Sequence, residues 1–197
     1  MAAFVQEKNR GLIVETEVKI GVQTFHKLVE LEMLKEDDRV ELIQGRMYAM
    51  SPIGLKHIAV VDKLGMLFNT FADKKFIVRI QGGIRLSEYS ELYPDIALLK
   101  YRDDFYADSY PNPESDVFLI VEVSDTSLNY DKYKKLPLYA ESKIPEVWIM
   151  NLQERVLEVY AMPDIEKKEY AFIRKAGTGE VKPLKLESVK LKIDEIF

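Results

Sequence analysis

A short apolar stretch with a glutamate near its end is the feature that most constrains the fold. Residues 117–124, "VFLIVEVS", are almost wholly apolar and rich in β-branched side chains, a composition typical of a buried strand. An unpaired carboxylate inside a sheet costs several kcal/mol unless it is neutralised or partnered. Glu122 must therefore face a partner, and the nature of that partner bears on function.

A second carboxylate lies at the start of another apolar strand. Side chains alternate across a strand, so Glu122 lies on the same face as Ile120 and Ser124. In "YPDIALL" (93–99), Asp95 follows Pro94 and precedes an apolar run. If the two strands are neighbours, the carboxylates of Asp95 and Glu122 come together. Two close carboxylates repel, and such a pair persists when it binds a cation or shares a proton.

The segment after residue 124 predicts a helix that carries a lysine towards this pair. In "NYDKYKKLPLYAESK" (129–143), Asp131, Lys135 and Tyr139 are spaced i, i+4, i+8 and lie on one side. Pro137 lacks a backbone N–H and is expected to kink the helix or mark an early turn. If this side faces Glu122, Lys135 can orient a water or balance transition-state charge. The alternative is a buried Lys135–Glu122 ion pair without a metal.

Composition narrows the possible metal chemistry and the compartment. The chain has 197 residues and no cysteine, which excludes disulfides and thiolate metal sites and fits a reducing cytoplasm. Carboxylates, two histidines and backbone oxygens remain as ligands, a set that favours Mg²⁺ or Mn²⁺. The chain lacks an apolar run long enough for a membrane span and a secretory signal at its start. We therefore expect a cytoplasmic protein with no membrane partner.

Charge argues against one class of DNA-binding protein. The formal net charge is −5, whereas proteins that bind nucleic acid through overall charge are usually basic. An enzyme with a locally basic cleft is not excluded, because the local field decides binding there.

Periodicity along the chain predicts one mixed α/β domain over residues 17–197, preceded by a loosely ordered arm over residues 1–16. Residues 101–116 form a long polar and aromatic loop, expected either to cover a substrate or to mediate dimer contacts. Trp148 is expected in the core and His26 at the surface. The expected elements are a helix over 24–34 capped by Thr24, a helix over 54–72 with Ile58 in its buried stripe, two strands around Gln44–Gly45, a strand over 76–86 broken at Gly82–Gly83, a hairpin over 146–162, a strand over 169–175 and strand-like pieces over 184–197.

Several motifs together resemble a known nuclease superfamily. "PD" at 94–95, the glutamate of "VEVS" at 121–124 and a lysine on the next helix resemble the PD-(D/E)XK nucleases. Over nearly the whole chain, the order and spacing of the motifs resemble the Uma-type putative restriction endonuclease family. The motifs are "RVELIQGRMYAMSP", His57 at the head of a helix, "YPDIALL", "VEVSDTS", "DKYKKLPLYA" and "LKIDEIF".

The resemblance implies a fold and an activity. The fold is α/β (α+β), with a restriction-endonuclease-like αβββαβ core, a mixed central sheet, flanking helices and additional C-terminal strands. The activity is Mg²⁺-dependent (or Mn²⁺-dependent) hydrolysis of DNA phosphodiester bonds by a metal-activated water. A homodimer is expected, because cutting both strands of a duplex needs two sites.

The chain departs from the superfamily motif at one position. The motif places its lysine two residues after the glutamate, where this chain has Ser124. The resemblance then implies a lysine that has moved to the helix. Lys135 is preferred to Lys132 and Lys134 because it is in register with Asp131.

Roles for the remaining residues follow from this resemblance. Asp95 and Glu122 would bind the metal, with the Val123 carbonyl and Ser124 as minor or supporting ligands, and Lys135 would hold the attacking water. His57 either contacts the scissile phosphate or a metal-bound water, or caps its helix. Glu41 either has a structural partner or adds an acidic ligand, and Asp131 and Tyr139 are accessory. Two rival functions are a catalytically silent binding or scaffold protein of this fold and a hydrolase of smaller phosphate esters, which would need a narrow pocket.

Overall fold

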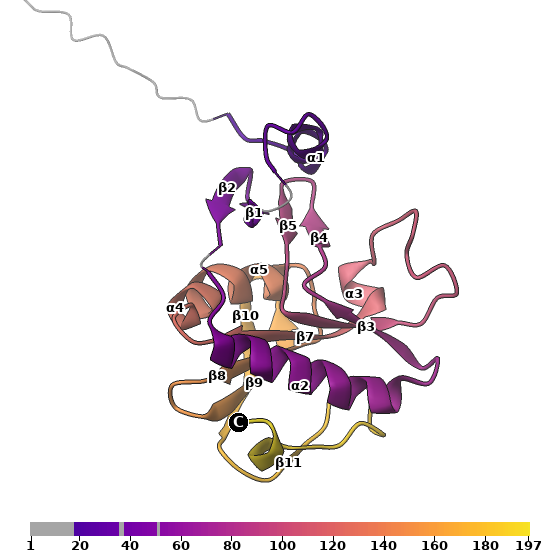
Figure 1. Ribbon diagram of the computed structural model, residues 1–197, viewed down its shortest axis with the longest axis vertical. Coiled ribbons are helices and arrows are strands. Elements are labelled where there is room, and N and C mark those ends of the chain that lie inside the picture. Colours follow the sequence, from indigo (N-terminus) through magenta and orange to yellow (C-terminus); the bar gives the residue numbers. More distant parts are fainter. Residues whose placement is uncertain (1–17, 36–37, 51) are drawn as a thin grey trace, which may run out of the picture.

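The computed structural model describes residues 18–35, 38–50 and 52–197, arranged around two main sheets (Figure 1). The predicted arm over residues 1–16 lies outside the described residues. The larger sheet has six strands and carries most of the core, and the smaller four-stranded sheet lies at one end of it (Figure 1).

The six-stranded sheet is mixed, with the strand order β10-β9-β8-β7-β6-β3. Strands β7 and β8 are parallel, and all other neighbours in this sheet are antiparallel. Parallel neighbours need a crossover connection, and here the crossover is helical. The strands are β3 (Phe76–Ile80), β6 (Ile96–Lys100), β7 (Val117–Ser124), β8 (Glu146–Asn151), β9 (Val156–Asp164) and β10 (Glu169–Ala176).

The crossover between β7 and β8 covers one face of this sheet. It consists of α4 (Leu128–Tyr130), a π-helical turn η1 (Asp131–Lys135) and α5 (Leu136–Glu141). Pro137 lies in the first turn of α5, where its missing N–H is tolerated, and wide π turns are frequent at functional sites. Of the two predictions for Pro137, the early turn is confirmed, because the residue lies in the first turn of α5 directly after the π-helical turn. Leu138, Tyr139 and Ala140 of α5 share one buried cluster with Val117 and Ile120 of β7.

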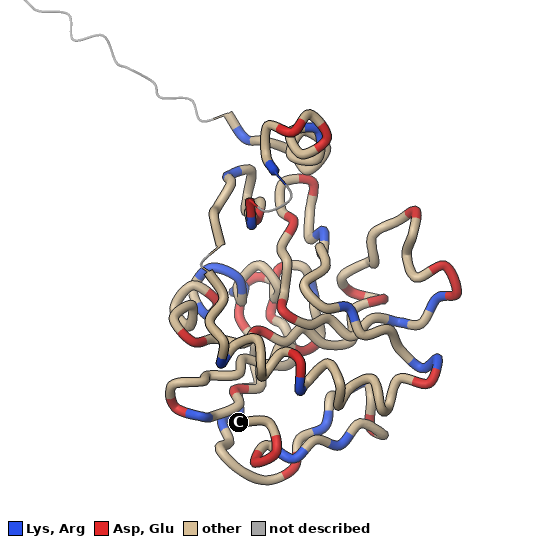
Figure 2. Tube along the Cα trace, viewed as in Figure 1, with Lys and Arg blue, Asp and Glu red and all other residues tan. Residues whose placement is uncertain are grey.

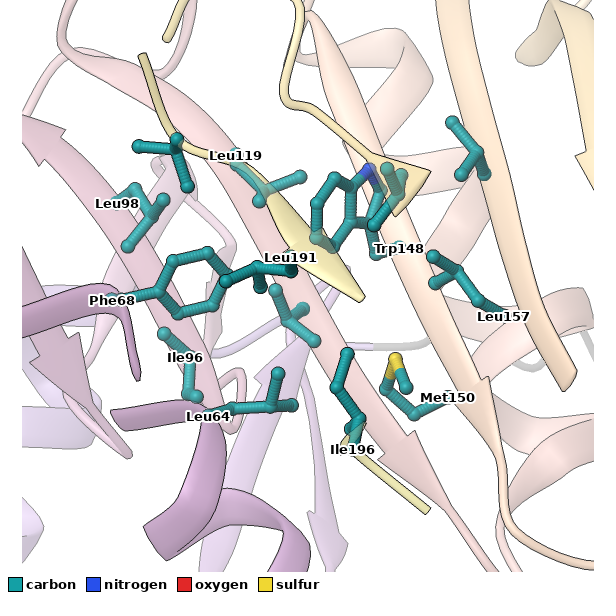
Figure 3. Close-up of a cluster of buried hydrophobic side chains, with 14 of the residues drawn as sticks. Leu64, Phe68, Ile96, Leu98, Leu119, Trp148, Met150, Leu157, Leu191 and Ile196 are labelled. Atoms are coloured by element: carbon teal, nitrogen blue, oxygen red, sulfur yellow. The ribbon is translucent and has the colours of Figure 1, made fainter. Parts of the chain in front are cut away.

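Helix α2 (Leu55–Ala72) covers the opposite face. Val61, Leu64 and Phe68 of α2 share a buried cluster with β7. The β7 members are Leu119, Val121 and Val123, and the Phe68 ring centroid lies 6.2 Å from that of Trp148. Trp148 is fully buried, as expected, whereas Ile58 is 42% exposed and does not belong to the buried stripe. Figure 3 shows the side chains of this cluster, among them Phe68, Leu119 and Trp148, next to the strands of the sheet. Of the helices described, none combines the length and apolarity that a membrane crossing requires.

The smaller sheet has the order β2-β1-β5-β4 and supports helix α1 (Val22–Glu30). Val22 and Phe25 of α1 pack on Leu42 of β1. The two predicted strands around Gln44–Gly45 are confirmed, and the break at Gly82–Gly83 separates β3 from β4, which belong to different sheets. The strands are β1 (Val40–Ile43), β2 (Arg46–Ala49), β4 (Ile84–Ser87) and β5 (Ser90–Leu92).

Three local expectations are corrected. Helix α1 begins after Gly21, ahead of the position that a Thr24 cap would give, and no side chain caps it. Its first N–H group, that of Val22, is satisfied by the Glu88 carbonyl of the neighbouring sheet region. The loop after β6 ends in a short helix, α3 (Pro113–Asp116). The C-terminal segment is mostly irregular, although its apolar side chains reach the core. Its regular elements are β11 (Glu180–Val181), β12 (Leu191–Lys192) and a 3₁₀ turn, η2 (Ile193–Glu195).

The predicted αβββαβ core is confirmed. It consists of α2, the crossover helices and four strands of the larger sheet. In chain order the core is α2, β3, β6, β7, the α4–α5 crossover and β8, and β9 and β10 extend the sheet beyond it.

The packing of α2 on the sheet gives a stability prediction. Phe68→Ala removes a fully buried ring and should lower the free energy of unfolding by about 3–5 kcal/mol. Met66→Ala, on the same helix but 64% exposed, should change it by less than about 0.5 kcal/mol. Urea denaturation followed by circular dichroism measures both. Equal effects of the two substitutions would contradict the placement of α2.

Candidate active site

Glu122 lies at the centre of a buried polar cluster between the sheet and the crossover helices. Its side chain is on the face of β7 that α5 covers, and the residue is 3% exposed. The Tyr139 hydroxyl donates to Glu122 Oε1 at 2.6 Å, and Lys135 Nζ lies 3.3 Å from the same oxygen. The helical register predicted from the sequence therefore brings Lys135 and Tyr139 to this carboxylate.

Lys135 joins three carboxylates from different elements. Besides Glu122, its ammonium lies 2.9 Å from Glu41 Oε1 on β1 and 3.9 Å from Asp131 Oδ1 one turn earlier. The neighbouring lysines have other partners outside this cluster. Lys132 pairs with Glu158 at 2.7 Å, and Lys134 lies 4.9 Å from the centre of the Tyr48 ring. Among the three candidate lysines, the structure brings Lys135 to Glu122.

Asp95 is held in the turn before β6 by two donors. Its Oδ2 accepts a hydrogen bond from the Val123 N–H at 2.8 Å and lies 3.0 Å from His57 Nε2. Strand β6 pairs with β7 only as far as Ile96 opposite Val121. Beyond that pair, the Asp95 side chain accepts the hydrogen bond from the N–H of β7 that a further strand residue would otherwise accept. The N–H and C=O of one strand residue point to the same side, and the Val123 carbonyl is therefore directed towards this edge.

Glu41 and His57 each carry a buried polar atom that lacks a partner among the described residues. Glu41 is fully buried, and its Oε1 accepts from the Tyr93 N–H and from Lys135, but its Oε2 has no hydrogen bond there. The buried Nδ1 of His57 likewise has no hydrogen bond to the described residues. A buried acceptor without a donor is costly, so these atoms mark positions where a further ligand or ion fits.

Asp131 is fixed by two hydroxyl groups. Ser124 Oγ and Ser127 Oγ each donate to Asp131 Oδ2 at 2.7 Å. Ser124 therefore orients Asp131 by a hydrogen bond, as Tyr139 orients Glu122. Ser127 was not singled out from the sequence, although it stands in the "VEVSDTS" motif.

The electrostatics of the cluster are dominated by burial and by excess negative charge. Burial raises the pKa of Glu122 well above its ordinary value, and the nearby Asp131 and Asp95 add to the effect while Lys135 opposes it. Burial likewise raises the pKa of Asp131. Burial alone would lower the pKa of Lys135, but the carboxylates of Glu122 and Glu41 outweigh it and raise that pKa. One ammonium thus contacts three buried carboxylates, and a fourth, that of Asp95, lies close enough to raise the pKa of Glu122.

These groups border an open pocket of about 330 Å³. The pocket lies between the two sheets, the start of α2 and the loop after β7. Arg39, which sequence reasoning did not identify, stands at its rim. Ser124 and Tyr139 do not line it. The sequence-predicted residues that do are Glu41, His57, Asp95, Glu122, Val123, Asp131 and Lys135.

The donor set fits a hard divalent cation, although the side chains are not arranged as a closed cage. Within the described residues, no three His, Asp or Glu side chains are placed to hold a metal ion directly. Lys135 stands between Glu41 and Glu122, the positions at which a cation would compete with it. The unpartnered Glu41 Oε2 and the other carboxylates lining the pocket are all oxygen donors, the type that Mg²⁺ prefers.

The fold places this chain in the class of restriction-endonuclease-like proteins. The chain matches the Uma2 family, described as putative restriction endonucleases, over residues 22–191. It therefore belongs to that family. No match was found among curated proteins.

A solved structure shares the fold. It is a putative nuclease of the DUF820 family from Anabaena variabilis, with a TM-score of 0.72 and 14% sequence identity. The match covers 90% of this chain and 97% of the other. At this identity the likeness shows the fold.

The buried charges give a prediction for Lys135. Lys135→Met leaves Glu41 and Glu122 without their shared cation, and loss of one partner of a buried ion pair costs about 3–5 kcal/mol. Lys134→Met removes a partly exposed lysine from the same turn and should cost less than about 1 kcal/mol. Urea denaturation at neutral pH measures the difference. A Lys135 variant as stable as the Lys134 variant would contradict the described contacts.

The raised pKa of Glu122 predicts a pH dependence. The fold holds this proton more tightly than the unfolded chain, so the protonated carboxyl stabilises the fold below about pH 4.5, its ordinary pKa. That stability is lost as the pH rises from there through the raised pKa, by about 1.4 kcal/mol for each unit of the raise. Glu122→Gln removes the titration. The free energy of unfolding of the variant, relative to the wild type, should therefore increase above pH 4.5.

Denaturation curves of both proteins over a pH series test this sign. A difference that is flat, or that decreases with pH, would show that Glu122 is not destabilised by its ionisation in the fold.

Proposed function

We propose that this protein is a metal-dependent endonuclease that hydrolyses DNA phosphodiester bonds at the Asp95–Glu122 pocket. The observation that carries the proposal is the excess of buried carboxylates around a single ammonium in an open pocket. Such an excess is stable when a cation binds. Membership of a family of putative restriction endonucleases supports the choice of substrate.

Asp95, Glu122 and the Val123 carbonyl would hold Mg²⁺ or Mn²⁺, with Glu41 as a further oxygen donor. The ion, when bound, would lower the pKa of a water molecule and offset charge on the phosphate. His57 and the Val123 N–H position Asp95, since both contact Oδ2. Tyr139 orients the Glu122 carboxylate through its hydroxyl hydrogen bond.

Lys135 has a separate role in this proposal. Its ammonium, held by Glu122 and Glu41, would orient the attacking water and stabilise the negative charge that develops on the phosphate. Asp131 holds the ammonium on its other side and is itself fixed by Ser124 and Ser127.

A catalytically silent binding or scaffold protein is the second candidate. The observation that favours it is the direct Lys135–Glu122 contact, which partly neutralises the carboxylate without a metal. The open pocket and the guanidinium of Arg39 at its rim favour cleavage instead. The two candidates differ in whether the wild-type protein cuts DNA.

We also propose a homodimer and a cytoplasmic location. A duplex cut on both strands needs two sites, and a chain without cysteines suits a reducing compartment.

Plasmid cleavage tests the proposed function. In Mg²⁺ or Mn²⁺ the wild type should nick or linearise supercoiled plasmid, and EDTA should abolish the reaction. Asp95→Asn and Glu122→Gln preserve side-chain shape and should each lower the rate at least about 100-fold, more than the loss of an outer partner typically costs. Glu154→Gln, in the exposed turn after β8, should cleave as the wild type does.

Circular dichroism of each variant confirms that it is folded. Absence of cleavage by the wild type, or unchanged cleavage by both folded site variants, would contradict the proposal.

A further inference from the structure

A buried carboxylate outside the candidate active site, that of Glu91, anchors an aromatic pair at the surface. Glu91 on β5 is 2% exposed. Its Oε2 lies 2.9 Å from His26 Nε2, and its Oε1 accepts the Tyr93 hydroxyl at 2.9 Å. His26, predicted at the surface, has a side chain that is 33% exposed, and its ring also contacts this buried partner.

His26 in turn supports Tyr110, from the long loop after β6. The two rings are stacked, with centroids 5.9 Å apart and planes at 22°. The Tyr110 hydroxyl lies 3.2 Å from His26 Nε2. Tyr110 is nevertheless 42% exposed, so part of its ring is open to solvent. Glu91, His26 and Tyr110 form a ring platform that a buried charge holds in place.

Between this platform and the candidate active site lies a series of adjacent hollows that share lining residues. The pocket of about 330 Å³ shares Arg39, Met50 and Tyr93 with a hollow of about 340 Å³. That hollow shares Val29 and Tyr93 with a third, of about 650 Å³, which His26 and Tyr110 line. We call this series the trough. Tyr93 lines all three of its parts.

Two guanidinium groups along the trough are not neutralised by carboxylates in the described part of the chain. Arg39 is partly buried and has no side-chain hydrogen bond or ion pair among those residues. Arg79 donates to the carbonyls of Gly83 and Phe105 and lies 5.6 Å from the centre of the Tyr106 ring. Their positive charges are therefore available to phosphate groups.

Binding of a polyanion to this protein depends on the charges inside the trough, because the whole chain carries a net charge of −5. Acidic and basic residues are interspersed along the described trace (Figure 2). This backbone view of the described residues therefore shows no long basic segment that would attract a polyanion. The two outer hollows are also lined by the exposed carboxylates of Glu30, Asp38 and Asp108, so phosphates would have to lie at the guanidinium groups and away from these three. The Glu91 carboxylate, in contrast, is buried and already engaged by His26 and Tyr93. A partner with phosphates and flat rings would meet Arg39, Arg79 and Tyr110 at separate points.

We propose that the trough binds a single-stranded segment of the DNA substrate, with a base on the Tyr110 ring and phosphates at Arg79 and Arg39. The inference rests on the proposed nuclease function and specifies its substrate: DNA with a single-stranded tail or gap. A base within a duplex is covered by its neighbours, whereas an unpaired base can stack on an exposed aromatic ring. Such grooves combine basic side chains with stacking platforms.

Fluorescence anisotropy in EDTA tests this proposal without cleavage. The probes are a labelled single-stranded DNA of about 15 nucleotides, a length within the range of known single-strand sites, and the duplex of the same sequence. The wild type should bind the single strand at least about fivefold more tightly. Equal or tighter binding of the duplex would overturn the proposal, as would no binding of either.

Variants locate the binding. Tyr110→Ala should weaken single-strand binding about tenfold, since stacking of one base is worth this much or more, and Tyr110→Phe should retain it. Arg79→Gln should weaken binding and reduce its salt dependence. The matched controls are Tyr89→Ala, of similar exposure but outside the trough, and Arg174→Gln on β10. Losses no larger than those of the controls would overturn the proposal.

The same preparations separate this inference from the proposed function. Plasmid cleavage without preferential single-strand binding would retain the nuclease and remove the trough. Single-strand binding that Tyr110→Ala reduces, with no cleavage by the wild type, would retain the trough and remove the nuclease.

Discussion

The burial of carboxylates around the ammonium of Lys135 is the interaction on which the site depends. Glu41, Glu122 and Asp131 come from different elements, and a single cation joins them at 2.9, 3.3 and 3.9 Å. Desolvated like charges are tolerated only with such a partner. The small sheet, the large sheet and the crossover helix are thereby tied together at one point, which is also the border of the pocket.

The parallel pairing of β7 and β8 explains why this point lies where it does. A parallel pair requires a crossover, and the crossover places η1 and α5 over the face of β7 that carries Glu122. The end of the β6–β7 ladder leaves the Val123 N–H to Asp95. Topology thus accounts for both acidic side chains, and α2, from the opposite face, adds His57.

Local sequence patterns correctly predicted which side chains share one face of a strand or helix. They gave no information about contacts between elements that are distant in the sequence. The alternation in β7 predicted the face of Glu122, and the i, i+4, i+8 spacing predicted Lys135 and Tyr139 on one side. The contact of Glu41 with Lys135 and the stack of His26 on Tyr110 join residues far apart in the chain, for which periodicity gives no signal. The Thr24 cap prediction failed because the first N–H of α1 has a backbone partner, the Glu88 carbonyl, which is distant in the sequence.

The most direct test of the account is the binding of Mn²⁺ by isothermal titration calorimetry, with wild type and Glu122→Gln compared at neutral pH. The account predicts that the wild type binds the ion and that the substitution abolishes or strongly weakens binding, because a neutral amide replaces a buried carboxylate ligand. No binding of the ion by the folded wild type, or unchanged binding by the Glu122→Gln variant, would contradict it. Glu122 would then be the structural partner of Lys135 alone.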